Sequence, residues 1–173
     1  LFHPDPAHDW KALATALGAE LVEIRASHAI LWAPAGADHR RALAAIDPAL
    51  RLMSAGERIE IFKQRGLPAA VADRFGLQDL AGSHAVGHTR MATESAVTTE
   101  HSHPFSTGPD LCLVHNGSLS NHNRLRSRLE REGIVFGTDN DSEVAAGYLT
   151  WRMREGATLH EALTAALSDL DGF

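Results

Sequence analysis

Apolar and polar residues alternate in two ways along the first half of the chain. Windows with apolar residues every three or four positions predict helices, and windows with strict alternation predict half-buried strands. The expected helices cover residues 9–17, 38–46 and 68–75, and the expected strands cover residues 20–25, 28–33, 50–53 and 58–62. This rhythm predicts a compact α/β subdomain or an insertion, and it carries no chemical motif.

The second half combines longer helical patterns with a long polar loop. Strands are expected at residues 83–89, 111–115 and 134–136, and helices at residues 121–132 and 142–153. The run Thr158-Leu159-His160-Glu161 has the form of a capping box that opens a final helix. The polar stretch of residues 91–109 is long for a loop in a compact domain, and such loops are usually functional.

Composition narrows the class of protein. The chain has 173 residues, 44% of them hydrophobic, so it can build a core. The net charge of −6 disfavours nucleic acid as a partner, because phosphate contacts need clustered cations. No apolar run approaches the ~18 residues of a membrane span. The single cysteine, Cys112, excludes an internal disulfide framework and favours a reducing, cytoplasmic location.

Three separated motifs carry the candidate chemistry. They are the runs of residues 87–93 (GHTRMAT), 115–117 (HNG) and 138–143 (TDNDSE). Together they supply an arginine, an amide beside a glycine, and a carboxylate. An arginine can pair with an α-carboxylate, a carboxylate with an α-ammonium, and an Asn-Gly step can offer two donors to an oxyanion. This set suits a small zwitterionic amide such as glutamine.

In these motifs the chain resembles a class II glutamine amidotransferase domain of the N-terminal-nucleophile hydrolase type. The resemblance covers residues 83–173. The amino-acid sequence of this region is most similar to the amidotransferase subunit of glutamate-synthase-like and N-methylglutamate-synthase-like complexes. It implies an α+β fold, a four-layer αββα sandwich that is incomplete here at both ends. We therefore expect residues 81–173 to be part of the amidotransferase core and residues 1–80 to be an additional α/β region.

The resemblance also implies roles for individual residues. Arg90 would grip the α-carboxylate of glutamine, for which a planar fork of donors is better suited than a lysine. Asp141 would receive the α-ammonium, and it could also cap the helix that it begins. Asp139 is a nearby alternative, but the sequence Asp-Ser-Glu, which begins at residue 141, favours Asp141.

The remaining implied site residues surround the reacting carbonyl. Asn116 and Gly117 would form the oxyanion hole through a side-chain amide and a backbone N–H. Met91 and Thr93 would line the substrate pocket, and His103 would lie in the loop beside it. The alternative for Asn116-Gly117 is a plain turn.

The nucleophile is the main departure from the family. The family uses a cysteine at the mature N-terminus, with its own α-amino group as base, whereas this chain begins with Leu1. Cys112 cannot replace it, because an internal residue has no free amine, and it is expected to be a small core residue. Three explanations stay open: a nucleophile upstream of Leu1, a nucleophile on a separate chain, or loss of catalysis. The abrupt ends of the sequence favour the first.

The predicted function is hydrolysis of glutamine to glutamate, with delivery of the ammonia to a partner synthase subunit. The resemblance implies that this partner carries flavin and iron–sulfur cofactors, whereas no cofactor is expected in this chain, which has no cysteine cluster and no dinucleotide fingerprint. An inactive glutamine-binding or scaffolding subunit is the alternative. Zinc binding by His101, His103 and His115 is a third hypothesis, but their spacing does not fit a metal site, so no metal is expected.

Overall fold

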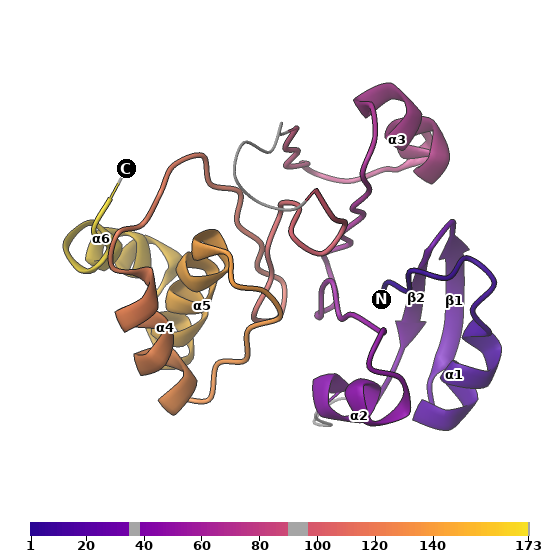
Figure 1. The fold of residues 1–173 in the computed structure, drawn as a ribbon, viewed down its shortest axis with the longest axis horizontal. Coiled ribbons are helices and arrows are strands. Elements are labelled where there is room, and N and C mark those ends of the chain that lie inside the picture. The colour runs from indigo at the N-terminus through magenta and orange to yellow at the C-terminus, as the bar shows by residue number, and fades with distance from the viewer. Residues whose placement is uncertain (35–38, 90–96, 173) are drawn as a thin grey trace. The chain divides into compact units, whose positions relative to one another are not determined.

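The structure is a computed structural model that describes residues 1–34, 39–89 and 97–172 (Figure 1). It divides into two compact units. The first unit is Leu1–Met53 with Gly66–Gly82, and the second unit is Ser54–Arg65 with Ser83–Phe173. The sequence analysis divides the chain at residue 80 by expected function, whereas the two units are defined by contacts. The functional division stays a prediction.

The first unit is built on a two-stranded antiparallel sheet. Strand β1 (Glu20–Arg25) pairs with β2 (His28–Trp32), from Glu20 opposite Trp32 to Arg25 opposite His28. The tight turn between the strands places Ala26 at a positive φ of 51°. Three α-helices, α1 (Trp10–Leu17), α2 (His39–Ile46) and α3 (Pro68–Phe75), and the short 3₁₀ helix η1 (Leu77–Asp79) complete the unit.

Local sequence explains where α1 begins and ends. The carboxylate of Asp9 accepts hydrogen bonds from the backbone N–H groups of Lys11 and Ala12, which satisfies donors that the first turn leaves free. Gly18 ends the helix in the left-handed region at φ 62°. The helix then buries its apolar face in a core of five side chains: Trp10, Leu13, Ala29, Leu43 and Leu50.

The second unit is a helical assembly around α5 (Asp141–Arg154), which contacts both α4 (His122–Arg131) and α6 (Leu159–Asp169). Every residue of α5 from Ser142 to Leu149 is buried. The helix approaches the preceding segment closely at Gly147, where an added Cβ would lie 2.6 Å from a ring carbon of Phe136. Any larger residue at this position would therefore displace one of the two segments.

The helices and the first two strands of the sequence analysis are confirmed, with boundaries that differ by at most one residue. The strands expected at residues 50–53, 58–62, 83–89, 111–115 and 134–136 are wrong for the structure described here. Residues 51 and 113 form isolated bridges, to Phe2 and Phe105. The expected alternation of side chains holds at Ile61, which is buried between the exposed Glu60 and the half-buried Phe62. A strand also requires a neighbouring backbone to pair with along its length, and alternation alone does not provide one.

The observed fold class is α+β, with helices and an antiparallel sheet. Within the described ranges, none of the helices combines the length and the apolar character that crossing a membrane requires.

The start of α6 provides a test of local stability. Thr158 Oγ1 accepts a hydrogen bond from the Glu161 N–H at 3.2 Å, and the Glu161 carboxylate accepts one from the Thr158 N–H at 2.8 Å. We predict that Thr158→Ala lowers the free energy of unfolding by about 1 kcal/mol in urea denaturation. Thr164→Ala, inside the same helix and exposed, is the matched control and should cause no loss. Equal losses in both variants would contradict the capping role.

Candidate functional site

The N-terminus of α5 positions the carboxylate that the sequence analysis assigns to the substrate ammonium. Asn140 caps the helix by accepting a hydrogen bond from the Ser142 N–H at 2.8 Å, and Asp141 is the first residue of the helix. Asp141 Oδ2 accepts a hydrogen bond from the backbone N–H of Leu119 at 2.8 Å. The side chain of Asp141 therefore ties the helix to the loop that follows Asn116 and Gly117.

A second connection joins the same two segments one residue further along. The buried Ser142 hydroxyl and Nδ1 of His115 are hydrogen-bonded at 3.0 Å. Asn116 and Gly117 are thus held between two fixed points, His115 and Leu119, which both bond to the first turn of α5. Asn116 and Gly117 are themselves exposed.

His103 lies against the same loop. Its Nδ1 accepts a hydrogen bond from the His115 N–H at 3.4 Å, and its ring stacks on the ring of His88 with the centroids 4.4 Å apart. Its ring also lies edge to face with the Phe105 ring, with the centroids 4.9 Å apart. Segments of all three sequence motifs are therefore adjacent in the second unit.

Three of the predicted site residues, Arg90, Met91 and Thr93, lie outside the described residues. Their assignment to the substrate carboxylate and to the pocket wall stays a prediction. Of the predicted residues that the structure describes, it brings together Asn116, Gly117, Asp141 and His103.

Asp139 and Asp141 have different surroundings, although they are two residues apart. The Asp139 side chain is 93% exposed, and its carboxylate lies 3.2 Å from Nε2 of His101. Asp141 is half-buried and bonds to the loop of the candidate site. The geometry therefore favours Asp141 over Asp139 for a role at that loop.

Glu143 is a structural residue of the site that the sequence analysis quoted but did not assign. Its carboxylate is buried and accepts hydrogen bonds from the N–H groups of Gly137 and Thr138, at 2.8 and 2.7 Å. Arg126 donates to the carbonyl oxygens of Thr138 and Asn140 from the other side. These bonds fix the segment that leads into α5, and hence the direction from which Asp141 enters the site.

Lys63 was missed by the sequence analysis. It is only 5% exposed, its ammonium donates to the carbonyl of Glu100 at 3.4 Å, and it lies 4.6 Å from the centre of the Phe105 ring. Burial lowers its pKa to about 8, against the opposing attraction of Glu143 and Glu100. In the sequence, Lys63 stands two residues after Ile61. In an alternating pattern this spacing places the lysine on the same side of the chain as the buried apolar residue.

Cys112 is half-buried, rather than fully buried as the sequence suggested. Burial raises the pKa of its thiol, so little thiolate forms near neutral pH. This environment is opposite to that of an activated cysteine nucleophile.

Comparison with known proteins assigns the segment that contains these residues to a family. Residues 88–172 match the family described as the glutamine amidotransferase domain. They belong to that family. The match begins at His88 and contains the segments that carry His103, Asn116, Gly117 and Asp141.

Individual relatives agree with the family match. The glutamine amidotransferase-like protein GlxB of Rhizobium meliloti (strain 1021) is 59% identical over 154 residues, which are 88% of this chain and 51% of that protein. A protein of Methanothermobacter thermautotrophicus whose name also includes glutamine amidotransferase is 38% identical over 123 residues, 70% of this chain and 40% of that protein.

A glutamine–fructose-6-phosphate aminotransferase of Vibrio vulnificus (strain YJ016) is 34% identical over 110 residues, 64% of this chain and 18% of that protein. The resemblance to class II amidotransferases is therefore confirmed. The chain spans about half the length, or less, of the relatives it matches. The resemblance to the subunit of one particular kind of synthase complex stays a prediction.

The buried Lys63 of the second unit leads to a prediction of how the stability of the chain depends on pH. Its pKa is 10.5 when unperturbed and about 8 in the fold, so the folded chain binds fewer protons than the unfolded chain between these values. The burial penalty is fully present below about pH 8, and stability rises with pH as the penalty is lost toward pH 10.5. Urea denaturation across this range should show a smaller rise for Lys63→Met than for the wild type.

Lys11→Met is the matched control, because Lys11 is the other lysine of the sequence and is exposed. Its stability profile should run parallel to that of the wild type. A Lys63→Met profile that is also parallel would show that Lys63 does not titrate in this range.

Proposed function

We propose that this chain supplies the glutamine-binding and oxyanion-stabilising part of a glutaminase, which hydrolyses glutamine to glutamate and ammonia. The observation that carries the proposal is the 2.8 Å hydrogen bond from the Leu119 N–H to Asp141 Oδ2. It links the candidate substrate-binding carboxylate to the loop of the candidate oxyanion hole, so the two ends of one small substrate would meet one connected structure.

Asp141 has the right chemistry for the α-ammonium of glutamine. One of its oxygens is bonded to Leu119, and a carboxylate has further lone pairs with which to accept an ammonium N–H. The N-terminus of α5 stabilises the negative charge of the carboxylate through the helix dipole. In this proposal Arg90 receives the α-carboxylate of the substrate, and Met91, Thr93 and His103 contribute to the pocket.

Asn116 and Gly117 would act on the other end of glutamine. Attack of a thiolate on the side-chain carbonyl carbon places a negative charge on its oxygen, and the Asn116 amide and the Gly117 N–H would donate to that oxygen. The intermediate then expels the nitrogen, which leaves as ammonia after it takes up a proton. Water hydrolyses the resulting thioester to glutamate and restores the thiol.

The nucleophile of this reaction would be an N-terminal cysteine upstream of Leu1, and the complete domain would form the four-layer αββα sandwich of the family. Two observations support a residue outside this chain: Cys112 has a raised pKa, and the matched relatives are longer than this chain. We further propose that the ammonia passes to a cytoplasmic synthase subunit with flavin and iron–sulfur cofactors. Only the resemblance of the motif sequences supports this partner.

A charge-removing substitution tests the role of Asp141 without disturbing the loop. In Asp141→Asn the amide oxygen can still accept from Leu119, but the side chain no longer carries a charge to pair with an ammonium. We expect the KM for glutamine to rise by at least about tenfold, because the loss of a hydrogen bond between charged groups weakens binding by about this factor. Steady-state kinetics of the complete polypeptide provide the measurement. Asp139→Asn, two residues away and exposed, should leave KM unchanged, and the reverse pattern would assign the role to Asp139.

Substitution at Asn116 should act on the chemical step instead. Asn116→Ala removes one donor to the oxyanion, so kcat should fall by roughly 10²-fold or more with little change in KM. Asn123→Ala, an exposed asparagine on α4, is the control and should retain full activity. An unchanged kcat in Asn116→Ala would remove this residue from the mechanism.

Assays of the complete polypeptide distinguish a glutaminase from a glutamine-binding subunit. A glutaminase releases ammonia from glutamine, whereas a binding subunit takes up glutamine in calorimetry without releasing ammonia. Binding without turnover in the complete natural polypeptide would refute the enzymatic proposal while leaving the binding role of Asp141 intact.

A further inference from the structure

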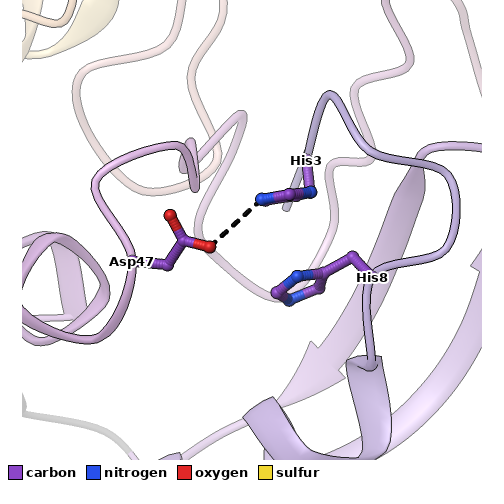
Figure 2. Close-up of side chains that lie close together, drawn as sticks. All are labelled: His3, His8 and Asp47. Atoms are coloured by element: carbon purple, nitrogen blue, oxygen red, sulfur yellow. Dashed lines mark hydrogen bonds and ion pairs between the residues drawn. The ribbon is translucent and has the colours of Figure 1, made fainter.

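The first unit contains a side-chain cluster that the amidotransferase role does not use. His3, His8 and Asp47 converge, although they come from three different places in the first unit (Figure 2). His3 lies in the N-terminal segment, His8 precedes the N-cap of α1, and Asp47 directly follows α2. One nitrogen or oxygen from each residue lies within 4.8 Å of the other two. Among the described residues, this is the group of three such side chains that is close enough to hold a metal ion.

We propose that His3, His8 and Asp47 bind one divalent first-row transition-metal ion, such as Zn²⁺, which joins the N-terminal segment to the end of α2. Two imidazoles and a carboxylate form a donor set that suits zinc, iron or cobalt better than calcium or magnesium. The proposal is independent of glutamine hydrolysis, because none of the three residues belongs to the candidate amidotransferase site.

Two of the three ligands are already at the spacing that a metal requires. His3 Nε2 lies 3.2 Å from Asp47 Oδ2. Two ligand atoms each about 2.0 Å from a tetrahedral zinc ion lie about 3.3 Å apart. Asp47 Oδ1 accepts from the Ala49 N–H at 2.8 Å, which orients the carboxylate so that Oδ2 faces His3.

The other ring nitrogen of His3 has the partner that a metal-binding histidine needs. Nδ1 lies 3.2 Å from the carbonyl oxygen of Asp5, and when it is unprotonated it accepts a hydrogen bond from the backbone N–H of Asp5 at 3.1 Å. When Nε2 binds a metal, the proton resides on Nδ1, which then donates to the Asp5 carbonyl. Such outer hydrogen bonds fix the tautomer and orientation of metal-ligating imidazoles.

His8 supplies an independent observation. Its Nε2 is buried and has no hydrogen-bond partner, which is costly for a polar atom and calls for an explanation. The His8 ring stacks on the His3 ring, with centroids 4.1 Å apart and planes inclined by 25°. A shared ion therefore requires the His8 ring to turn toward the His3–Asp47 pair, and this turn would provide its unpartnered nitrogen with a ligand bond.

Backbone hydrogen bonds hold the three segments in place before any ion binds. The His3 N–H donates to Ser27 at 3.0 Å, the His8 N–H to the Asp5 carbonyl at 3.2 Å, and the Asp47 N–H to Leu43 at 2.9 Å. The backbone of the site is therefore in place before an ion binds, and the His8 ring is the part that must turn. Three protein ligands leave at least one coordination position for water or another molecule.

The test is titration of the full chain, free of any polyhistidine tag, with Zn²⁺ in a calorimeter. We expect one ion per chain and a higher melting temperature in the presence of Zn²⁺, reversed by a chelator. His8→Gln and Asp47→Asn should each weaken binding by at least about tenfold and abolish the thermal shift. Asp47→Asn retains an oxygen to accept from Ala49, so the fold should be preserved.

His101→Gln is the matched control, because His101 also pairs with an aspartate, Asp139, in the second unit. It should bind Zn²⁺ as the wild type does. Histidine ring resonances of the unmodified chain give a readout that no substitution can confound: Zn²⁺ should shift the ring nitrogens of two histidines. Absence of binding at micromolar Zn²⁺, or binding that His8→Gln and Asp47→Asn leave unchanged, would overturn the proposal.

Discussion

The site depends on one hydrogen bond, between the Leu119 N–H and the Asp141 carboxylate. Asp141 begins α5, a helix buried along most of its length, so the position of its carboxylate is set by the core rather than by the surface. Leu119 closes the loop that carries Asn116 and Gly117. A rigid element thereby determines where an exposed loop presents its donors, as a preorganised oxyanion site requires.

Residues around this bond serve the same purpose at one remove. Glu143 and Arg126 fix the segment before α5 through its backbone groups, and His115 links the loop to Ser142. The acidic and amide residues proposed to contact glutamine are thus held by neighbours that would not touch it. This arrangement explains why residues 138–143 are dense in polar side chains although most of α5 is apolar.

Part of this could be predicted from the sequence. Helices with caps and stops, such as α1 between Asp9 and Gly18, are determined by nearby residues. The three motifs identified the family through their residues, order and spacing. The strands expected at residues 111–115 and 134–136 were wrong because pairing depends on distant segments. The contacts of Lys63 with Glu100 and of His3 with Asp47 join residues 37 and 44 positions apart, and no periodicity encodes them.

The most direct test of the central claim is a crystal structure of the complete polypeptide with glutamine bound. The account predicts that the α-ammonium lies within hydrogen-bonding distance of Asp141 while Leu119 keeps its bond to the same carboxylate, and that the side-chain carbonyl oxygen faces Asn116 and Gly117. Glutamine bound elsewhere, or bound with its ammonium away from Asp141, would contradict it.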